Sequence, residues 1–268
     1  MARRLIQDAR RFSLTAWRDS FRRGAGAAAC AAALYCGLLA LAIALPSAAG
    51  PPAPGGASGR VKSGTGFFVT LDGFLVTSAH VVAGCGNVSI WAQDGVERRG
   101  YLIASNAKRD IALLYGGYDV ARNAAILGRE PPRPGEDVFT LGFGVLAEEP
   151  LRPILVGGSY VGEDTATSGN RVLVIRAKLR AGNSGGALIG TDGSLLGMVI
   201  GRDEARPEMG VAIPSGDIEA VLSAHHIPLP ATPPRPSNAQ ALLSTISVLV
   251  QCAPASQHDA PSGAGRPG

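Results

Sequence analysis

The sequence is poor in aromatic side chains and rich in residues that bend the backbone. Aromatic residues make up 5% of its 268 residues, whereas glycine occurs 36 times and proline 19 times. Such a composition favours many short elements joined by turns and disfavours long helical bundles.

Histidine and cysteine, the usual ligands of transition metals, are also scarce, with four of each. His225 and His226 are adjacent and have no histidine or cysteine partners at the spacing of a metal site. We therefore expect neither a metal ion nor a cofactor.

Most of the chain has no surplus of charge of either sign. The formal net charge is +4, but residues 1–23 alone carry seven arginines against Asp8 and Asp19. The basic character therefore belongs to a short head, and it does not indicate a nucleic-acid partner.

A long uncharged segment follows the basic head. No charged side chain occurs from Gly24 to Gly50, and about 20 apolar residues suffice to cross a bilayer as a helix. Residues 24–49 are either a retained transmembrane anchor or a signal peptide cut after Ala49. We favour the anchor, because the basic head and the apolar core from Ala25 to Leu45 exceed the usual dimensions of a signal peptide.

The arginines of the head predict the orientation of this segment. Basic flanks stay in the cytoplasm, so residues 51 onward would lie on the periplasmic or other extracytoplasmic side of the inner (cytoplasmic) membrane. A cleaved segment would make the protein secreted. Cys85 and Cys252 would then share a compartment in which disulfides persist. They either form a bridge or stay separate thiols, and we favour separate thiols, because nothing in the sequence shows that the two lie close together.

A β-rich domain is predicted over residues 60–226, after a Pro/Gly linker at residues 50–59. Short apolar and β-branched runs alternate there with turns, and the pair Asp72-Gly73 between two such runs is typical of a hairpin. A break rich in proline and charge at residues 129–136 divides the series into two similar halves. This pattern predicts an all-β sandwich or barrel.

Helical periodicity replaces this pattern near the end of the domain. Ile218, Val221 and Leu222 share one face and predict a short closing helix. Residues 227–268 are expected to form a Pro/Ala/Ser-rich tail. Its apolar segment, Ala241 to Val250, is too short for a second membrane span and could pack on the domain as a strand or a helix.

Three segments carry residues suited to nucleophilic catalysis. TSAHVV contains His80, DIALL begins with Asp110, and GNSGGALI contains Ser184. Each residue alone has an ordinary structural explanation, namely a packed histidine, a strand boundary or a turn. Their occurrence together, in the order His, Asp, Ser within one β-rich domain, indicates a catalytic triad.

The segments SGTGFFV, GFLVTSAHVV, DIALL and GNSGGALI together resemble the protease domain of HtrA/DegP-type peptidases, within the trypsin-like (chymotrypsin-fold) superfamily. The resemblance extends from about Gly64 to about Leu222. It implies two six-stranded antiparallel β-barrels with an active site between them. The first barrel would supply His80 and Asp110, and the second Ser184.

The resemblance also implies a role for each residue. His80 would be the general base for the Ser184 hydroxyl, and Asp110 would orient the imidazole ring. The backbone N–H groups of Gly182 and Ser184 would form the oxyanion hole.

A substrate pocket is implied on either side of the nucleophile. Its apolar walls would favour small or medium aliphatic side chains, although a neighbouring exposed cation could instead attract an acidic one. The expected pocket residues are Leu179, Ala181, Val199 and Ile200.

These features predict a membrane-tethered, extracytoplasmic serine endopeptidase that acts on protein or peptide substrates. The alternative is a non-catalytic or partner-activated protein-binding module on the same fold. About 40 residues follow His226, too few for the PDZ domain that HtrA enzymes commonly carry there. The oligomeric state is left open.

Overall fold

The basic head, the expected membrane segment at residues 24–49 and the linker lie outside the residues that the structure describes. Within the described part, no helix is both long and apolar enough to span a bilayer. The computed structural model describes residues 61–92, 94–128, 132–144, 152–166, 168–203, 206–228 and 238–254.

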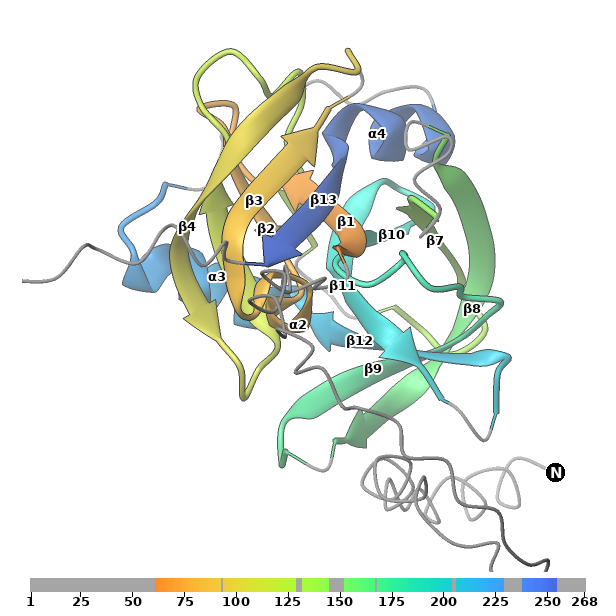
Figure 1. Ribbon diagram of the computed structural model, residues 1–268. Helices are drawn as coiled ribbons and strands as arrows, with labels where there is room; N and C mark the ends of the chain where they lie inside the picture. The colour runs from red at the N-terminus through yellow and green to blue at the C-terminus, as the bar shows by residue number, and fades with distance from the viewer. Residues whose placement is uncertain are drawn as a thin grey trace, which may run out of the picture. The chain divides into compact units, whose positions relative to one another are not determined.

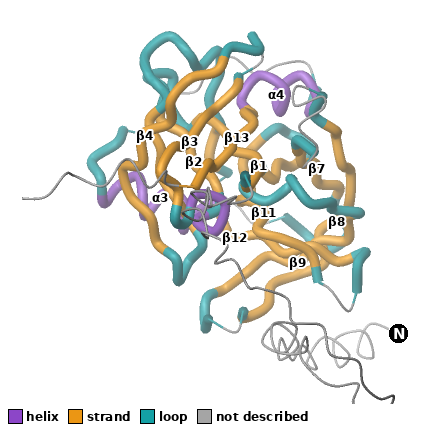
Figure 2. Tube along the Cα trace, viewed as in Figure 1, coloured by secondary structure: helices purple, strands orange, loops and turns teal. Residues whose placement is uncertain are grey.

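Strands dominate the described chain, as the alternation of short apolar runs and turns predicts (Figure 2). The first group of strands closes into a six-stranded barrel in which neighbouring strands are antiparallel. Around the ring these strands are β1 (Lys62–Phe68), β13 (Ser247–Pro254), β3 (Cys85–Trp91), β4 (Glu97–Asn106), β5 (Ile111–Tyr115) and β2 (Phe74–Thr77).

The second group also forms a ring, because β10 pairs with both β7 and β11. The two barrels confirm the expected architecture (Figure 1). A short strand, β6 (Ile126–Leu127), pairs in parallel with β11, so the second sheet begins before the break at residues 129–136. The six strands of the ring are β10 (Ala187–Gly190), β7 (Asp137–Gly142), β8 (Ile154–Thr165), β9 (Arg171–Ala177), β12 (Met209–Pro214) and β11 (Ser194–Arg202).

The C-terminal part of the chain returns to the first barrel. The expected closing helix is present as α3 (Ser215–Ala224), which buries Ile218 and Leu222. Beyond it, the expected tail contributes α4 (Ala239–Ile246) and β13, which lies between β1 and β3 (Figure 1). The domain therefore does not end at residue 226 but continues to the end of β13.

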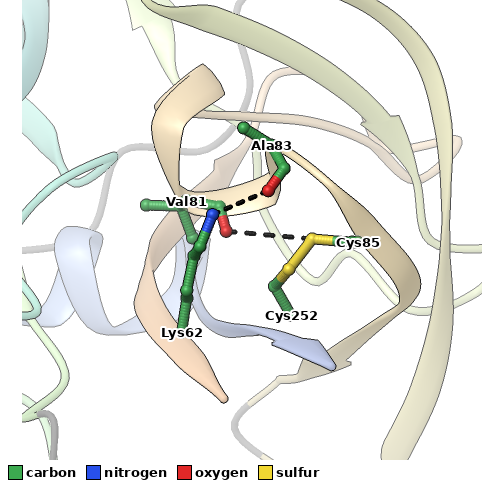
Figure 3. The surroundings of a disulfide bond; sticks show 5 residues. All are labelled: Lys62, Val81, Ala83, Cys85 and Cys252. Atoms are coloured by element: carbon green, nitrogen blue, oxygen red, sulfur yellow. Dashed lines mark hydrogen bonds between the residues drawn. A yellow bond between two sulfur atoms is a disulfide. The ribbon is translucent and has the colours of Figure 1, made fainter. Parts of the chain in front are cut away.

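A disulfide joins Cys85, at the start of β3, to Cys252 in β13, with their Cα atoms 5.3 Å apart (Figure 3). This finding overturns the preference for separate thiols. The pairing of β13 with β3 brings the two cysteines together, because Pro254 lies opposite Cys85 and Val88 opposite Cys252. The bridge lies beside the short helix α2 (Ala79–Val82), with Cys85 Sγ 3.9 Å from the carbonyl oxygen of Val81.

The hydrophobic core holds the two barrels together. One cluster fills the first barrel and another fills the second. A further cluster includes Phe67 of β1, Leu141 of β7, Ile218 of α3 and Leu243 of α4, all fully or almost fully buried. Each such side chain contributes about 1.5–3 kcal/mol on burial. The shared cluster fixes the seam between the barrels, where the candidate site lies.

Candidate active site

His80 and Asp110 are brought together by the pairing of β2 with β5. His80 lies in α2, just after β2, and Asp110 immediately precedes β5. Thr77 lies opposite Ala112 in the ladder, so the residues just outside it are neighbours. The structure therefore places these two predicted residues side by side.

Asp110 holds both the backbone and the ring of His80. Its Oδ2 lies 2.8 Å from His80 Nδ1, and its Oδ1 accepts a 2.9 Å hydrogen bond from the His80 backbone N–H. The carbonyl of Asp110 also accepts from the N–H of Ala79 at 3.2 Å. The second ring nitrogen, Nε2, makes no hydrogen bond within the described part of the chain, and half of the side chain is exposed to solvent (50%). Nε2 is therefore the nitrogen that remains for proton transfer.

Ser184 lies in the nucleophile turn, residues 181–186, within the connection between β9 and β10. Its hydroxyl donates a 3.2 Å hydrogen bond to the carbonyl of Ile200 in β11 and not to the His80 ring. Of the expected Ser–His–Asp chain of hydrogen bonds, only the His–Asp part is therefore formed. Catalytic hydrogen bonds in the absence of substrate are often loose or misdirected.

Some backbone amides of this turn are engaged and others are free. The N–H groups of Asn183, Gly185 and Gly186 all donate to backbone carbonyl groups. Those of Gly182 and Ser184, like that of Ala181, have no acceptor in the described part of the chain. Gly182 and Ser184 are the two donors that the resemblance implies for an oxyanion hole.

Glycine is the only residue type that fits position 182 in this turn. Its φ of +97° is a conformation that favours glycine. A Cβ at this position would also overlap the carbonyl oxygen of Phe143. The turn therefore needs glycine at the position whose N–H is a candidate oxyanion donor.

The four expected pocket residues occupy two different environments. Leu179 (3% exposed) and Val199 (0%) are packed in the core of the second barrel. Ala181 is exposed and Ile200 is half-buried, so these two have accessible side chains. The pocket assignment itself remains a prediction. The described residues contain no cluster of three or more side chains that could hold a metal ion.

Thr65, for which the sequence motifs predict no role, contacts the nucleophile turn. It lies in β1 and hydrogen-bonds to Gly182 and Ser184 across the seam between the barrels. It belongs to the SGTGFFV segment that contributes to the resemblance, but a threonine in a strand is ordinary β-sheet composition, and the segment alone does not predict this contact.

Comparison with known proteins identifies the class of this domain. The family model for the trypsin-like peptidase domain matches residues 64–198. The chain therefore belongs to the family of trypsin-like peptidase domains, as its sequence motifs and its two barrels predict.

Several of the similar proteins are serine proteases, HtrA-type enzymes among them. Serine protease Rv3671c of Mycobacterium tuberculosis H37Rv is 31% identical over 170 residues, which cover 61% of this chain and 42% of the relative. Serine protease HTRA1B of Danio rerio is 31% identical over 172 residues, which cover 62% and 35%. This chain thus spans less than half the length of these relatives. The crystal structure of the Rv3671c protease in its active form matches with a TM-score of 0.55 and 27% identity, over 67% of this chain and 79% of that one.

Proposed function

We propose that the chain is a serine endopeptidase in which Ser184 is the nucleophile, His80 the general base and Asp110 the residue that orients the base. The observation that carries this proposal is the double hydrogen bond from His80 to Asp110, which leaves Nε2 as the free ring nitrogen. A fixed imidazole of this kind is what activation of a serine hydroxyl requires.

The chemistry follows from these positions. Ser184 Oγ exchanges its hydrogen bond with Ile200 for one with His80 Nε2, which takes the hydroxyl proton as Oγ attacks a peptide carbonyl. The free N–H groups of Gly182 and Ser184 bind the oxyanion that develops, and a single donor of this type is worth about 10²–10³-fold in kcat. His80 then returns the proton to the leaving amine, and water hydrolyses the acyl-enzyme.

We propose further that this domain is tethered to the inner membrane and acts on protein or peptide substrates outside the cytoplasm. The uncharged segment from Gly24 to Gly50 and the arginines before it support this placement. The Cys85–Cys252 disulfide also supports it, because such bonds persist in oxidising compartments.

A partner-activated protein-binding module is the second candidate, and the hydrogen bond from Ser184 to Ile200 favours it. In that case the nucleophile would stay turned away from His80 until a partner binds.

One experiment separates the two candidates. The full 268-residue chain is treated with a fluorophosphonate probe, beside the S184A and H80A variants, and all three are checked for folding by near-ultraviolet circular dichroism. We expect one adduct on the wild type, none on either variant, and hydrolysis of unfolded casein by the wild type alone. A folded wild type that neither reacts with the probe nor hydrolyses casein would contradict constitutive peptidase activity and support the binding module.

A further inference from the structure

We propose that Thr65 is a positioning residue for the oxyanion hole. From the first barrel, it holds two peptide groups of the second barrel, one on each side of the amide of Ser184. The inference rests on the proposed peptidase function and adds to it a residue outside the triad and the nucleophile turn.

Thr65 is completely buried, and every polar atom that it directs at the seam is engaged. Its hydroxyl donates to the carbonyl of Gly182 at 2.6 Å and accepts from the N–H of Phe143 at 3.1 Å. Its backbone N–H donates to the carbonyl of Ser184 at 2.8 Å. Thr65 is itself held in place, because Thr77 Oγ1 donates to its carbonyl at 2.6 Å.

The peptide group that links Gly182 to Asn183 is fixed at both ends. Its carbonyl accepts from the Thr65 hydroxyl, and its N–H, that of Asn183, donates to the carbonyl of Arg180 at 3.1 Å. Gly182 can adopt conformations that other residues avoid, so its flanking peptides need external contacts to stay in one orientation.

The peptide group that links Ser184 to Gly185 is fixed in the same way. Its carbonyl accepts from the Thr65 N–H, and its own N–H donates to the carbonyl of Val199 at 2.7 Å. Thr65 thus supplies one anchor to each of the two peptides, one from its side chain and one from its backbone.

The peptide group between these two carries the Ser184 N–H. Its carbonyl, that of Asn183, accepts from the N–H of Gly186 at 2.9 Å. Because a trans peptide is planar, its N–H points away from its carbonyl, and the Ser184 N–H has no acceptor in the described part of the chain. The orientation of this donor therefore depends on neighbours that Thr65 holds.

Loss of the Thr65 hydroxyl would leave the Gly182 carbonyl and the Phe143 amide buried without partners. The turn would relieve this by rotating the peptide that follows Gly182. Donors that stabilise a developing oxyanion act only when they are already aimed at it. The effect should therefore appear in kcat and not in KM.

The test compares T65V, which keeps the shape of the side chain, with T65S, which keeps the hydroxyl, in the full 268-residue chain. A matched control is T70V, because Thr70 is also buried and its hydroxyl also accepts a backbone hydrogen bond, from Phe74 at 3.2 Å, in the turn between β1 and β2. We expect kcat for a peptide amide to fall about 100-fold in T65V with KM changed less than about threefold. T65S and T70V should keep kcat within about threefold of the wild type.

Two results would overturn the assignment: a folded T65V with kcat within about threefold of the wild type, or a loss in T65S as large as that in T65V. T65A serves as a second variant without the hydroxyl. The comparison uses T65V or T65A, depending on which variant keeps the near-ultraviolet circular dichroism spectrum of the wild type and is therefore folded.

A second measurement does not depend on catalysis. Amide hydrogen exchange of residues 182–185 should become at least about tenfold faster in T65V and stay unchanged in T70V. Unchanged exchange in T65V would refute the positioning role. A wild type without activity would instead refute the peptidase proposal, and the exchange measurement would still decide the role of Thr65.

Discussion

Asp110 combines an unfavourable backbone conformation with two hydrogen bonds to a single residue. Its φ is +55°, a left-handed conformation that costs a residue with a side chain about 1–2 kcal/mol. Strain of this kind persists where the surrounding structure imposes it, and it concentrates at functional sites. Here the conformation allows one carboxylate to hold both the backbone N–H and the ring of His80.

This geometry predicts the effect of D110N. Asparagine tolerates the left-handed region, and its carbonyl oxygen can still accept from the His80 backbone, so the fold should be retained. Its amide group would face Nδ1 and force the ring proton onto Nε2, so His80 could no longer accept the serine proton. We expect kcat to fall about 10⁴-fold, with the melting temperature changed little.

Asp119 provides the control for this substitution. It is exposed and has nearly the same backbone conformation, with φ of +60°. D119N should leave kcat and the melting temperature unchanged. If D110N keeps more than a tenth of the wild-type kcat, Asp110 is not the residue that sets the state of His80.

The sequence motifs predicted the three residues of the candidate triad, but they gave no role to Thr65. His80 and Asp110 could be predicted as neighbours because their motifs together resemble those of a known peptidase family, and in the structure the two side chains meet. Thr65 could not be predicted, because its role depends on which carbonyls lie opposite it across the seam. Hydrogen bonds between distant segments leave no mark in local sequence.

At the scale of elements, the pattern of short strands was predictable and the partners of those strands were not. Alternating runs separated by turns predicted the hairpin at Asp72-Gly73 and the all-β fold. The segment from Ala241 to Val250 allowed a strand or a helix, and the structure uses both, with α4 followed by β13. Its place between β1 and β3 follows from closure of the first barrel, which local propensity cannot reveal.

The disulfide between β3 and β13 carries a prediction at this scale. It links residues 167 positions apart, so it excludes many extended conformations of the unfolded chain. Replacing both cysteines, in C85S/C252S, should lower the free energy of unfolding by about 2–5 kcal/mol. Guanidinium denaturation followed by circular dichroism measures this change.

The same variant provides its own control. Reductant should lower the denaturation midpoint of the wild type and leave that of C85S/C252S unaltered. Because the double variant keeps Cys30 and Cys36, an unaltered midpoint would show that these two cysteines do not cause the change. Coincident midpoints for oxidised wild type and the double variant would show that the bridge adds no stability. Because Cys85 adjoins α2, the helix that carries His80, kcat should be measured alongside the midpoint.

At the scale of the whole molecule, the candidate site depends on contacts between the barrels. The first barrel supplies His80, Asp110 and Thr65, and the second supplies the nucleophile turn. The shared hydrophobic cluster, with Phe67 and Leu141 among its members, keeps these parts in register. An active site assembled in this way would need both barrels folded before the proposed oxyanion hole could form.

The last prediction concerns the compartment in which that assembly takes place. Seven arginines in residues 1–23 precede the uncharged segment and should hold the head in the cytoplasm, so we expect the domain to be exported. We expect the full chain to remain in the membrane fraction after alkaline carbonate extraction, with its mass showing that residues 1–49 are retained. Deletion of residues 1–49 should release the domain into the soluble cytoplasmic fraction. A soluble exported domain that begins after Ala49 would support the cleaved signal instead.

The disulfide offers an independent report on the same question. In a chain carrying C30S and C36S, the remaining cysteines are Cys85 and Cys252. Because Cys252 is buried, both chains are denatured without reductant before labelling, and an oxidising compartment should leave neither cysteine of the exported chain reactive toward a maleimide reagent. The deleted chain, kept in the reducing cytoplasm, should take up two labels. Two labels on the full chain would place the domain in the cytoplasm and contradict the proposed orientation, whatever the membrane fractionation shows.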